Sequence, residues 1–492
     1  MPAPFPSRAY PGWQLQNSYA SLPALFHRAT LPTPVREPRL VLFNPLLART
    51  LGLDPAPASQ PDSAALFTGN RLPEGAKPLA QAYAGHQFGH FTILGDGRAI
   101  LLGEQITPTG GRFDIQLKGP GPTPYSRSGD GRAALGPMLR EYIISEAMHG
   151  LGIPTTRSLA VATTGESVTR QHRLPGAVLT RIAASHIRVG TFEFAAAHGD
   201  RADLQSLADY TIQRHDPQLA ALENPYTAFL QAVMGRQAAL IARWLHVGFI
   251  HGVMNTDNMS IAGETIDYGP CAFMDSYDPS TVFSSIDHQG RYAYANQPHI
   301  AQWNLARFAE TLLPLLHPDK DESLGLANAA IQGFPSQFET CYLDGMRKKL
   351  GLFNEEPGDS SLTADLLECL HLAEADFTNT FRHLSTAQSL PGTPPEAGPF
   401  YSWRERWNAR RARQPQSIVE SSQLMEASNP AIIPRNHQVE LALAAATDHN
   451  DFGPTQQLLA ALVDPFKVDS THIPYQTLPG SGACSYQTFC GT

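Results

Sequence analysis

The stretch H-G-V-M-N-T-D-N at residues 251–258, followed nine residues later by D-Y-G at residues 267–269, decides the fold that this sequence predicts. The apolar segments around it predict a buried helix, a polar loop, and then a hairpin that ends in an acidic residue. This order brings the side-chain amide of Asn258 close to the carboxylate of Asp267. Because amide and carboxylate oxygens are hard ligands, the pair predicts a site for Mg²⁺ or Mn²⁺.

The elements around this stretch follow from apolar periodicity. Between residues 228 and 247 apolar side chains recur mostly at three- and four-residue intervals, which predicts a core helix ended by Gly248. Residues 259–261 and 265–267 lie on either side of a three-residue turn and predict the short hairpin. Downstream of Arg307 the pattern predicts mostly helices.

Two strands and a helix are predicted upstream. Residues 99–102 and 113–117 are short apolar runs between glycine-rich turns, which indicates antiparallel strands. Residues 132–149 carry apolar side chains at approximately helical spacing and are followed by a glycine, which indicates a helix beside the strands. Lys118 ends the second apolar run and Glu141 lies on the helix, an order that allows the two side chains to pair.

The order of these features is that of a protein kinase. Kinases hold their nucleotide metals with the Asn of H-R-D-x-x-x-x-N and the Asp of D-F-G, while a glycine-rich loop and a strand Lys contact the phosphates. Here the turn L-G-D-G-R at residues 94–98, Lys118, Glu141, Asn258 and Asp267 occur in that order. Their joint occurrence predicts a kinase-like binding site for ATP.

One residue departs from the kinase signature. Val253 stands where the signature has its catalytic Asp, and valine accepts no proton from a substrate hydroxyl. Ordinary phosphoryl transfer to protein is therefore disfavoured. Asp257, next to Asn258, offers a carboxylate that can act as a general base from another direction.

Composition excludes several other classes of protein. The 492 residues are 42% apolar and 16% charged, which is typical of globular proteins, and the net charge of -9 gives no basic field for nucleic acid. No apolar run has the length of a membrane span, and the first residues lack the pattern of a signal peptide. We therefore expect a cytoplasmic protein without nucleic-acid or membrane partners. The five cysteines show no zinc-site spacing and no disulfide framework.

Several stretches resemble the selenoprotein O family, which consists of protein adenylyltransferases with a pseudokinase fold. The stretches that carry the resemblance are Y-A-G-H-Q-F-G at 83–89, L-G-D-G-R-A at 94–99, L-K-G at 117–119, Y-S-R at 125–127, G-D-G-R at 129–132, the loop at 251–259, D-Y-G-P at 267–270, Y-A-N-Q-P at 294–298 and W-N-L-A-R at 303–307. They run in order over close to half of the chain, so together they are more specific than any single kinase motif.

The fold expected with this resemblance is α+β, a protein-kinase-like two-lobed fold with additional N- and C-terminal helical elements. We expect an N-terminal extension at residues 1–80 and a small lobe at 81–176 that carries the glycine-rich turn and Lys118. A large lobe at 177–320 would carry the catalytic and metal-binding loops, and residues 321–492 would form a helical C-terminal region with a cysteine-bearing tail.

The resemblance implies that ATP is bound flipped relative to a kinase, so that the α-phosphorus faces the acceptor hydroxyl and pyrophosphate leaves. In this orientation, the valine at position 253 does not argue against catalysis. By the same resemblance, Asn258 and Asp267 would hold the metal and Asp257 would accept the proton. The nucleotide contacts implied by the resemblance are Gly95, Gly97, Arg98, Lys118, Asp130, Gly131, Arg181, Arg188 and Asp267. Without the resemblance, Arg181 and Arg188 would be interpreted as surface arginines.

The activity implied by the resemblance is transfer of AMP from ATP to Ser, Thr or Tyr hydroxyls of proteins, with UTP left open as a second donor. Two alternatives remain, a kinase-type phosphotransferase and a catalytically inert nucleotide-binding scaffold. The family also tends to carry a reactive residue near the C-terminus, a place that Cys490 occupies here. In some members it bridges to a cysteine whose position is Phe283 in this chain, although Cys271 lies nearby.

Overall fold

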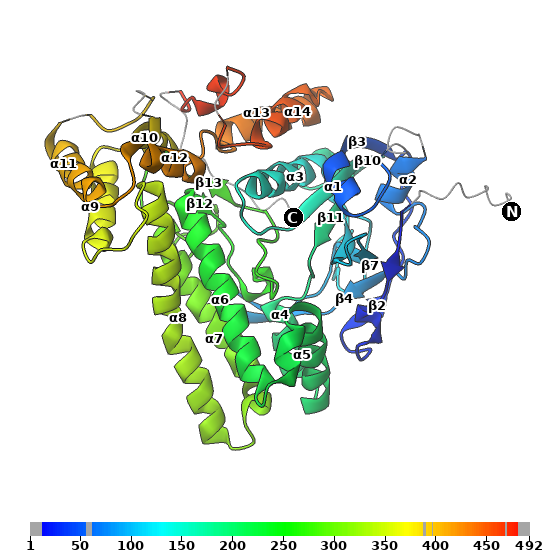
Figure 1. The fold of residues 1–492 in the computed structure, drawn as a ribbon. Coiled ribbons are helices and arrows are strands. Elements are labelled where there is room, and N and C mark those ends of the chain that lie inside the picture. Colours follow the sequence, from blue (N-terminus) through cyan, green and yellow to red (C-terminus); the bar gives the residue numbers. More distant parts are fainter. Residues whose placement is uncertain (1–11, 56–61, 387–389, 396, 468–469, 481–492) are drawn as a thin grey trace, which may run out of the picture.

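The computed structural model describes residues 12–55, 62–386, 390–395, 397–467 and 470–480, and its fold is α+β. Figure 1 shows a twisted sheet on one side and a group of long helices on the other, with a further set of helices along the top. The predicted thiol at Cys490 lies outside the described residues. Cys341 and Cys369 are free thiols, and Cys271 is buried.

Nine strands of the described chain form one sheet, and its named strand pairs are antiparallel. The path is β2-β4-β7-β8-β11-β10-β3, with β1 paired to β7 and β9 paired to β11. The bounds are β1 Leu15–Gln16, β2 His27–Ala29, β3 Arg39–Phe43, β4 Leu79–Gln81, β7 Ala99–Ile106, β8 Arg112–Lys118, β9 Ala133–Ala134, β10 Arg157–Thr169 and β11 Arg173–Ala183. The two strands predicted at 99–102 and 113–117 are confirmed as β7 and β8.

The segment before residue 81 is built into this sheet. Its strands β1, β2 and β3 pair with β7, β4 and β10, and its short helices α1 (Pro45–Thr50) and α2 (Ser63–Thr68) pack on one sheet face. Leu47 and Phe67 from these helices share a core with Ile100 and Ile115 of the central strands. Both faces of β7 and β8 are consequently buried, which explains their nearly continuous apolar sequence.

The helix α3 (Leu135–Gly150) confirms the helix predicted at residues 132–149. It begins a few residues later than predicted because Ala133 and Ala134 pair with β11. Gly152, with a φ of +73°, turns the chain away after the helix. Most of α3 is buried between the sheet and two C-terminal helices (Figure 1).

The long helices pack around α6 (Pro225–His246), which confirms the core helix predicted at residues 228–247. Asn224 caps its start by accepting a hydrogen bond from the Thr227 N–H at 3.1 Å, and Pro225 occupies its first position. The helices that surround it are α4 Val189–His198, α5 Arg201–His215, α7 Gln297–Leu316 and α8 Lys320–Lys349. A two-residue strand β12 (Phe249–Ile250) follows α6 and pairs with β13 (Ala272–Phe273).

The prediction of a hairpin at residues 259–267 is wrong. Its two halves do not pair with each other: Ser260 bridges to Arg188, and Thr265 bridges to Thr155. The backbone groups of each half are satisfied by other segments, for example Val189 N–H donating to the Met259 carbonyl at 2.9 Å. Each half is only three residues long, so other segments can pair with its few backbone N–H and C=O groups as well as the opposite half of a hairpin would. The turn between the halves is present and still returns the chain to Asp267.

The prediction of mostly helices after Arg307 is confirmed. Beyond α8, the helices are α9 Asp359–Leu372, α10 Phe377–Thr386, α11 Gly398–Ala412, α12 Ile418–Ser428, α13 Asn436–His449 and α14 Gly453–Leu462. Helices α13 and α14 return to pack against α3 (Figure 1).

Within the described residues, no helix combines the length and the apolar character needed to cross a membrane. A separate hairpin, β5 (Ala84–Gln87) with β6 (His90–Ile93), lies outside the main sheet.

A buried lysine should make stability depend on pH. Lys349 is 2% exposed and lies over the rings of Phe381 and Phe377, and burial lowers the pKa of its amine to about 7. Because the folded pKa lies below the unfolded one, the unfolded chain binds more protons between the two values, so stability rises with pH there by about 1.4 kcal/mol per unit.

We expect Lys349→Met to remove this slope and to raise the free energy of unfolding at neutral pH. Urea unfolding of the wild type and the variant between about pH 7 and pH 9 measures this slope, since the pH range begins at the pKa of Lys349 in the folded protein. Equal slopes for the wild type and the variant would contradict the expectation.

Candidate active site

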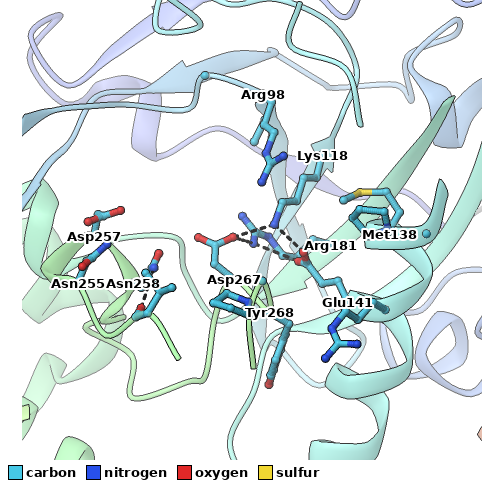
Figure 2. A pocket seen from close by; sticks show the side chains of 18 of the residues that line it. Arg98, Lys118, Met138, Glu141, Arg181, Asn255, Asp257, Asn258, Asp267 and Tyr268 are labelled. Carbon is cyan, nitrogen blue, oxygen red and sulfur yellow. Dashed lines mark hydrogen bonds and ion pairs between the residues drawn. The ribbon is translucent and has the colours of Figure 1, made fainter. Parts of the chain in front are cut away.

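A cavity of about 630 Å³ lies among the sheet, α3, α13 and the loop at residues 251–258. It gathers most of the predicted site residues, from segments far apart in the sequence (Figure 2). The predicted residues that line it are Gly97, Arg98, Lys118, Arg181, Arg188, Asp257, Asn258 and Asp267.

Lys118 connects the sheet to α3. Its ammonium lies 2.5 Å from Glu141 Oε2 and 2.9 Å from Asp267 Oδ1. Glu141 is 2% exposed, so this carboxylate is held away from water and its pairing with the lysine is tight. The pair predicted from the order of the sequence is confirmed.

Asp267 is enclosed by cations (Figure 2). Besides Lys118, Arg181 Nη1 lies 2.5 Å from its Oδ1 and Arg188 Nη1 lies 2.5 Å from its Oδ2. Both arginines are nearly inaccessible to solvent, so their interpretation as surface residues is wrong. No local sequence motif distinguishes a buried, salt-bridged arginine from a surface arginine. Only the family resemblance could therefore identify Arg181 and Arg188 as site residues.

The charges of these groups depend on one another. Burial opposes the ionisation of Asp267, but the charges of Lys118, Arg181 and Arg188 outweigh it and hold the pKa of this carboxyl well below its usual value. The three cations share the carboxylates of Asp267 and Glu141, so the five side chains together carry excess positive charge. Such a cluster, partly removed from water, favours an anion such as phosphate.

Asp267 also has an unusual backbone. Its φ is +62°, a left-handed conformation that few residues other than glycine adopt. Such a conformation costs of the order of 1 kcal/mol and persists where the surroundings fix it. Here the three ion pairs provide that constraint, and the turn points the carboxylate into the cavity (Figure 2).

The loop at residues 251–258 is held by α7. The Gln297 amide accepts a hydrogen bond from the His251 N–H at 3.0 Å and donates one to the Phe249 carbonyl at 2.9 Å. Asn304 Nδ2 donates to the Met254 carbonyl at 2.9 Å. These anchors belong to the Y-A-N-Q-P and W-N-L-A-R stretches, which the sequence singled out without giving them a role.

The end of the loop presents two polar side chains to the cavity. Asn258 Nδ2 donates to the Val253 carbonyl at 2.9 Å, which turns its amide group back across the loop and leaves Oδ1 as its acceptor. Asn255 Oδ1 accepts from the Tyr292 hydroxyl at 2.6 Å and from the Phe88 N–H at 3.1 Å. Asn255 was missed by sequence reasoning, although it lies within the signature loop.

Asp257 is a buried carboxyl whose Oδ1 has no hydrogen-bond partner among the described residues. The main-chain carbonyl of Asp257 accepts from Arg188 Nη1 at 2.7 Å. Burial raises the pKa of the Asp257 carboxyl to about 7, against the opposing charge of Arg188. A carboxyl that titrates near neutral pH and keeps an unpaired oxygen has the properties of a general base.

The glycine-rich turn at residues 94–98 joins β6 to β7 and contributes Gly97 and Arg98 to the cavity. Asp96 within the turn accepts a hydrogen bond from the Gln81 N–H at 3.1 Å. Burial raises the pKa of Asp96 to about 6, although Arg188 acts in the opposite direction. The turn is therefore tied to the sheet by its acidic side chain.

Three predicted contact residues are not among those that line the cavity. Gly95 packs against Tyr125, since a Cβ built on it would lie 2.4 Å from the tyrosine Cγ. Asp130 pairs with Arg170 at 2.9 Å, and its side chain is 45% exposed. Gly131 adopts a φ of +63° directly beside the Gly121 carbonyl. In this structure these three residues shape the loops around the cavity.

Helix α13 forms a wall of the cavity that no sequence pattern indicated. It contributes Glu440, Leu443, Ala444, Thr447 and Asp448, opposite Met138 and Arg140 of α3. Arg140 joins the two helices, with its Nη1 2.9 Å from Glu440 Oε1, and its Nη2 donates to the Cys271 carbonyl at 2.6 Å. Because α13 lies about 300 positions after α3, the contact depends on the tertiary fold alone.

The oxygen atoms of Asn258 and Asp267 suit a hard cation such as Mg²⁺ or Mn²⁺. Across the described ranges, no group of three or more His, Cys, Asp or Glu side chains is arranged to hold a metal. Mg²⁺ bound by Asn258 and Asp267 would complete its coordination with substrate phosphates and water, as it commonly does.

Comparison with known proteins adds independent information. The family model described as "Protein adenylyltransferase SelO" matches residues 12–463. The chain is 61% identical over 482 residues to the "Protein nucleotidyltransferase YdiU" of Halalkalibacterium halodurans. It is 60% identical over 482 residues to the protein of that name in Brevibacillus brevis and 59% identical over 483 residues to that in Syntrophotalea carbinolica. Each alignment covers 98% of this chain and 98% of the relative.

The ion pairs of Glu141 should be important for stability. In Glu141→Gln the charges of Lys118 and Arg181 lose a buried counter-charge, so we expect the free energy of unfolding to fall by about 3 kcal/mol. Asp365→Asn removes a carboxylate from the exposed Arg406 pair and should cost less than about 1 kcal/mol. Denaturant unfolding at neutral pH measures both, and similar losses in the two variants would contradict the role of burial.

Proposed function

Because the chain belongs to the SelO family of protein adenylyltransferases, we propose that it transfers AMP from ATP to Ser, Thr or Tyr hydroxyls of other proteins and releases pyrophosphate. Family membership makes it an enzyme of the nucleotidyltransferase class. The observation that carries the proposal is the cluster of Lys118, Arg181 and Arg188 around Asp267 on the wall of a cavity large enough for a nucleotide.

The proposed architecture is a protein-kinase-like fold of two lobes. The main sheet with α3 would correspond to the small lobe, and the helices around α6 would correspond to the large lobe. Two features support this assignment. A strand lysine pairs with a glutamate on the neighbouring helix, and the polar loop after α6 precedes an aspartate that faces the same lysine.

The proposed nucleotide lies with its β- and γ-phosphates among Lys118, Arg181 and Arg188. Pyrophosphate gains negative charge as it leaves, and fixed cations stabilise that charge where it develops. The adenosine would extend toward α3 and α13, where Met138 and Leu443 offer apolar surface. This orientation turns the α-phosphorus toward the acceptor, as AMP transfer requires.

Mg²⁺ or Mn²⁺ is the proposed metal, held by Asn258 and Asp267. When bound, such a cation neutralises phosphate charge and orients the phosphates for attack. Asp257 is the proposed base: it lines the cavity, and its carboxylate takes the proton from the acceptor hydroxyl as the oxygen attacks.

The two alternative functions have less support. A kinase-type mechanism lacks its base, because Val253 stands at that position and is buried. An inert scaffold would need no cluster of cations around a metal-binding aspartate, yet these ion pairs are complete.

A labelling experiment separates the three functions. The protein is incubated with Mg²⁺ or Mn²⁺, candidate acceptor proteins, and ATP labelled at either the α- or the γ-phosphate. We expect protein-bound label from the α position only, together with released pyrophosphate. Label from γ would indicate a kinase, and label from neither would indicate a scaffold. The same assay with α-labelled UTP tests whether UMP is also transferred.

We expect Asp267→Ala to abolish AMP transfer, with a loss of at least about 100-fold in kcat/KM, because a metal ligand and the partner of three cations are removed together. Asp344→Ala is the control, since that carboxylate pairs with Lys348 on the exposed face of α8. Thermal unfolding of both variants checks that each is folded at the assay temperature. An unchanged rate in Asp267→Ala would remove Asp267 from the site.

A further inference from the structure

The stretch at residues 83–89 lies directly against Asp257. The His86 N–H donates to Thr256 Oγ1 at 2.7 Å, and the Phe88 N–H donates to Asn255 Oδ1 at 3.1 Å. A Cβ atom built on Gly85 would lie 2.2 Å from Asp257 Oδ1. Strand β5 thus forms one wall around the Asp257 side chain.

Helix α4 supplies a buried carboxylate at the same place. Glu193 Oε2 accepts from the Thr256 hydroxyl at 2.5 Å, and Oε1 lies 2.5 Å from His86 Nδ1. The Glu193 side chain is 3% exposed. The Thr256 hydroxyl therefore donates to Glu193 while it accepts from the backbone of His86, and these two bonds fix its rotamer.

The start of α4 restrains the same turn from the other side. Arg188, the residue before the helix, donates from Nη1 to the Asp257 carbonyl at 2.7 Å. A Cβ atom on Gly190 would lie 3.2 Å from Asp257 Cα and 2.0 Å from the Ala84 carbonyl oxygen. Helix α4, β5 and the turn at residues 255–258 therefore pack without spare space.

No hydrogen bond holds Oδ1 of the Asp257 carboxylate in the described part of the chain. The position of this oxygen therefore depends on its packing against β5 and on the turn that carries it. Thr256 is the immediate neighbour, it is fully buried, and its side chain is held from both α4 and β5.

We propose that Glu193 is a positioning residue for AMP transfer: through Thr256 and His86 it fixes the turn that aims the Asp257 carboxylate into the cavity. This inference rests on the proposed function, in which Asp257 is the base. Glu193 itself contacts no reacting atom. Its loss displaces Asp257 by a fraction of an ångström, and misplacement on this scale slows catalysis about 10- to 100-fold without removing a nucleotide contact.

The test compares Glu193→Gln with a matched control. Asp216→Asn also removes a buried carboxylate, in this case one that pairs with Arg236 at 2.7 Å and lies outside the cavity lining. In Glu193→Gln we expect kcat for AMP transfer to fall about 10- to 100-fold while KM for ATP stays within about twofold. In Asp216→Asn we expect a lower melting temperature with kcat within about twofold of wild type.

A second pair of variants keeps the test valid if Glu193→Gln folds poorly. Thr256→Val removes the hydroxyl and should reproduce the fall in kcat, whereas Thr256→Ser retains the hydroxyl and should recover most of it. The double variant Glu193→Gln/Asp257→Asn should be no slower than Asp257→Asn alone, because both changes act through one carboxylate.

The outcomes separate this inference from the proposed function. If the wild type transfers no α-label, the proposed function fails. If the wild type transfers α-label but Glu193→Gln lowers kcat no more than Asp216→Asn does, or if the double variant shows additive losses, the positioning role is overturned and the proposed function stands.

Discussion

The structure depends on the ion pairs that surround Asp267. A carboxylate and three cations, contributed by β8, β11 and the segment before α4, meet at one point between the sheet and the long helices. Charges removed from water are costly unless they are paired, so the sheet and the helical part stabilise each other through this contact. The same contact holds the strained backbone of Asp267 and places three cations around it on one wall of the cavity. The ion pairs that stabilise the fold are therefore also the groups proposed to receive the phosphates.

A second constraint acts on the loop at residues 251–258, which has little regular structure of its own. Its carbonyl and N–H groups are satisfied by side-chain amides from α7, and its hydroxyl and carboxamide side chains are held from α4, β5 and Tyr292. Buried polar groups need such partners, and a loop without a ladder must obtain them from side chains. This accounts for the many Gln, Asn, Thr and Glu residues buried around the loop. These hydrogen bonds fix the path of the loop, while Asp257 Oδ1 is left without a partner among the described residues.

The sequence predicts the features whose signals are local. Apolar periodicity locates α3, α6, β7 and β8, and the order of motifs identifies Lys118, Glu141, Asn258 and Asp267 as neighbours. It fails where no motif marks the distant partner. The wall made by α13, the strands contributed by the N-terminal segment and the Glu193 contact depend on tertiary packing, which leaves no mark in spacing. The predicted hairpin fails for a related reason, since the backbone groups of its two halves pair with the segments around Thr155 and Arg188.

Two glycines make room for the carboxylate of Asp257. Val253 contributes its carbonyl to Asn258, so that part of the loop supports the amide, while the carboxylate comes from the turn that faces β5 and α4. A carboxylate at this place needs room between a strand and a helix start that approach each other closely. Gly85 and Gly190 provide that room, because a Cβ on either would overlap Asp257 Oδ1 or the Ala84 carbonyl. The close packing of β5 against the start of α4 therefore accommodates a carboxylate at position 257 only because both neighbouring positions are glycine.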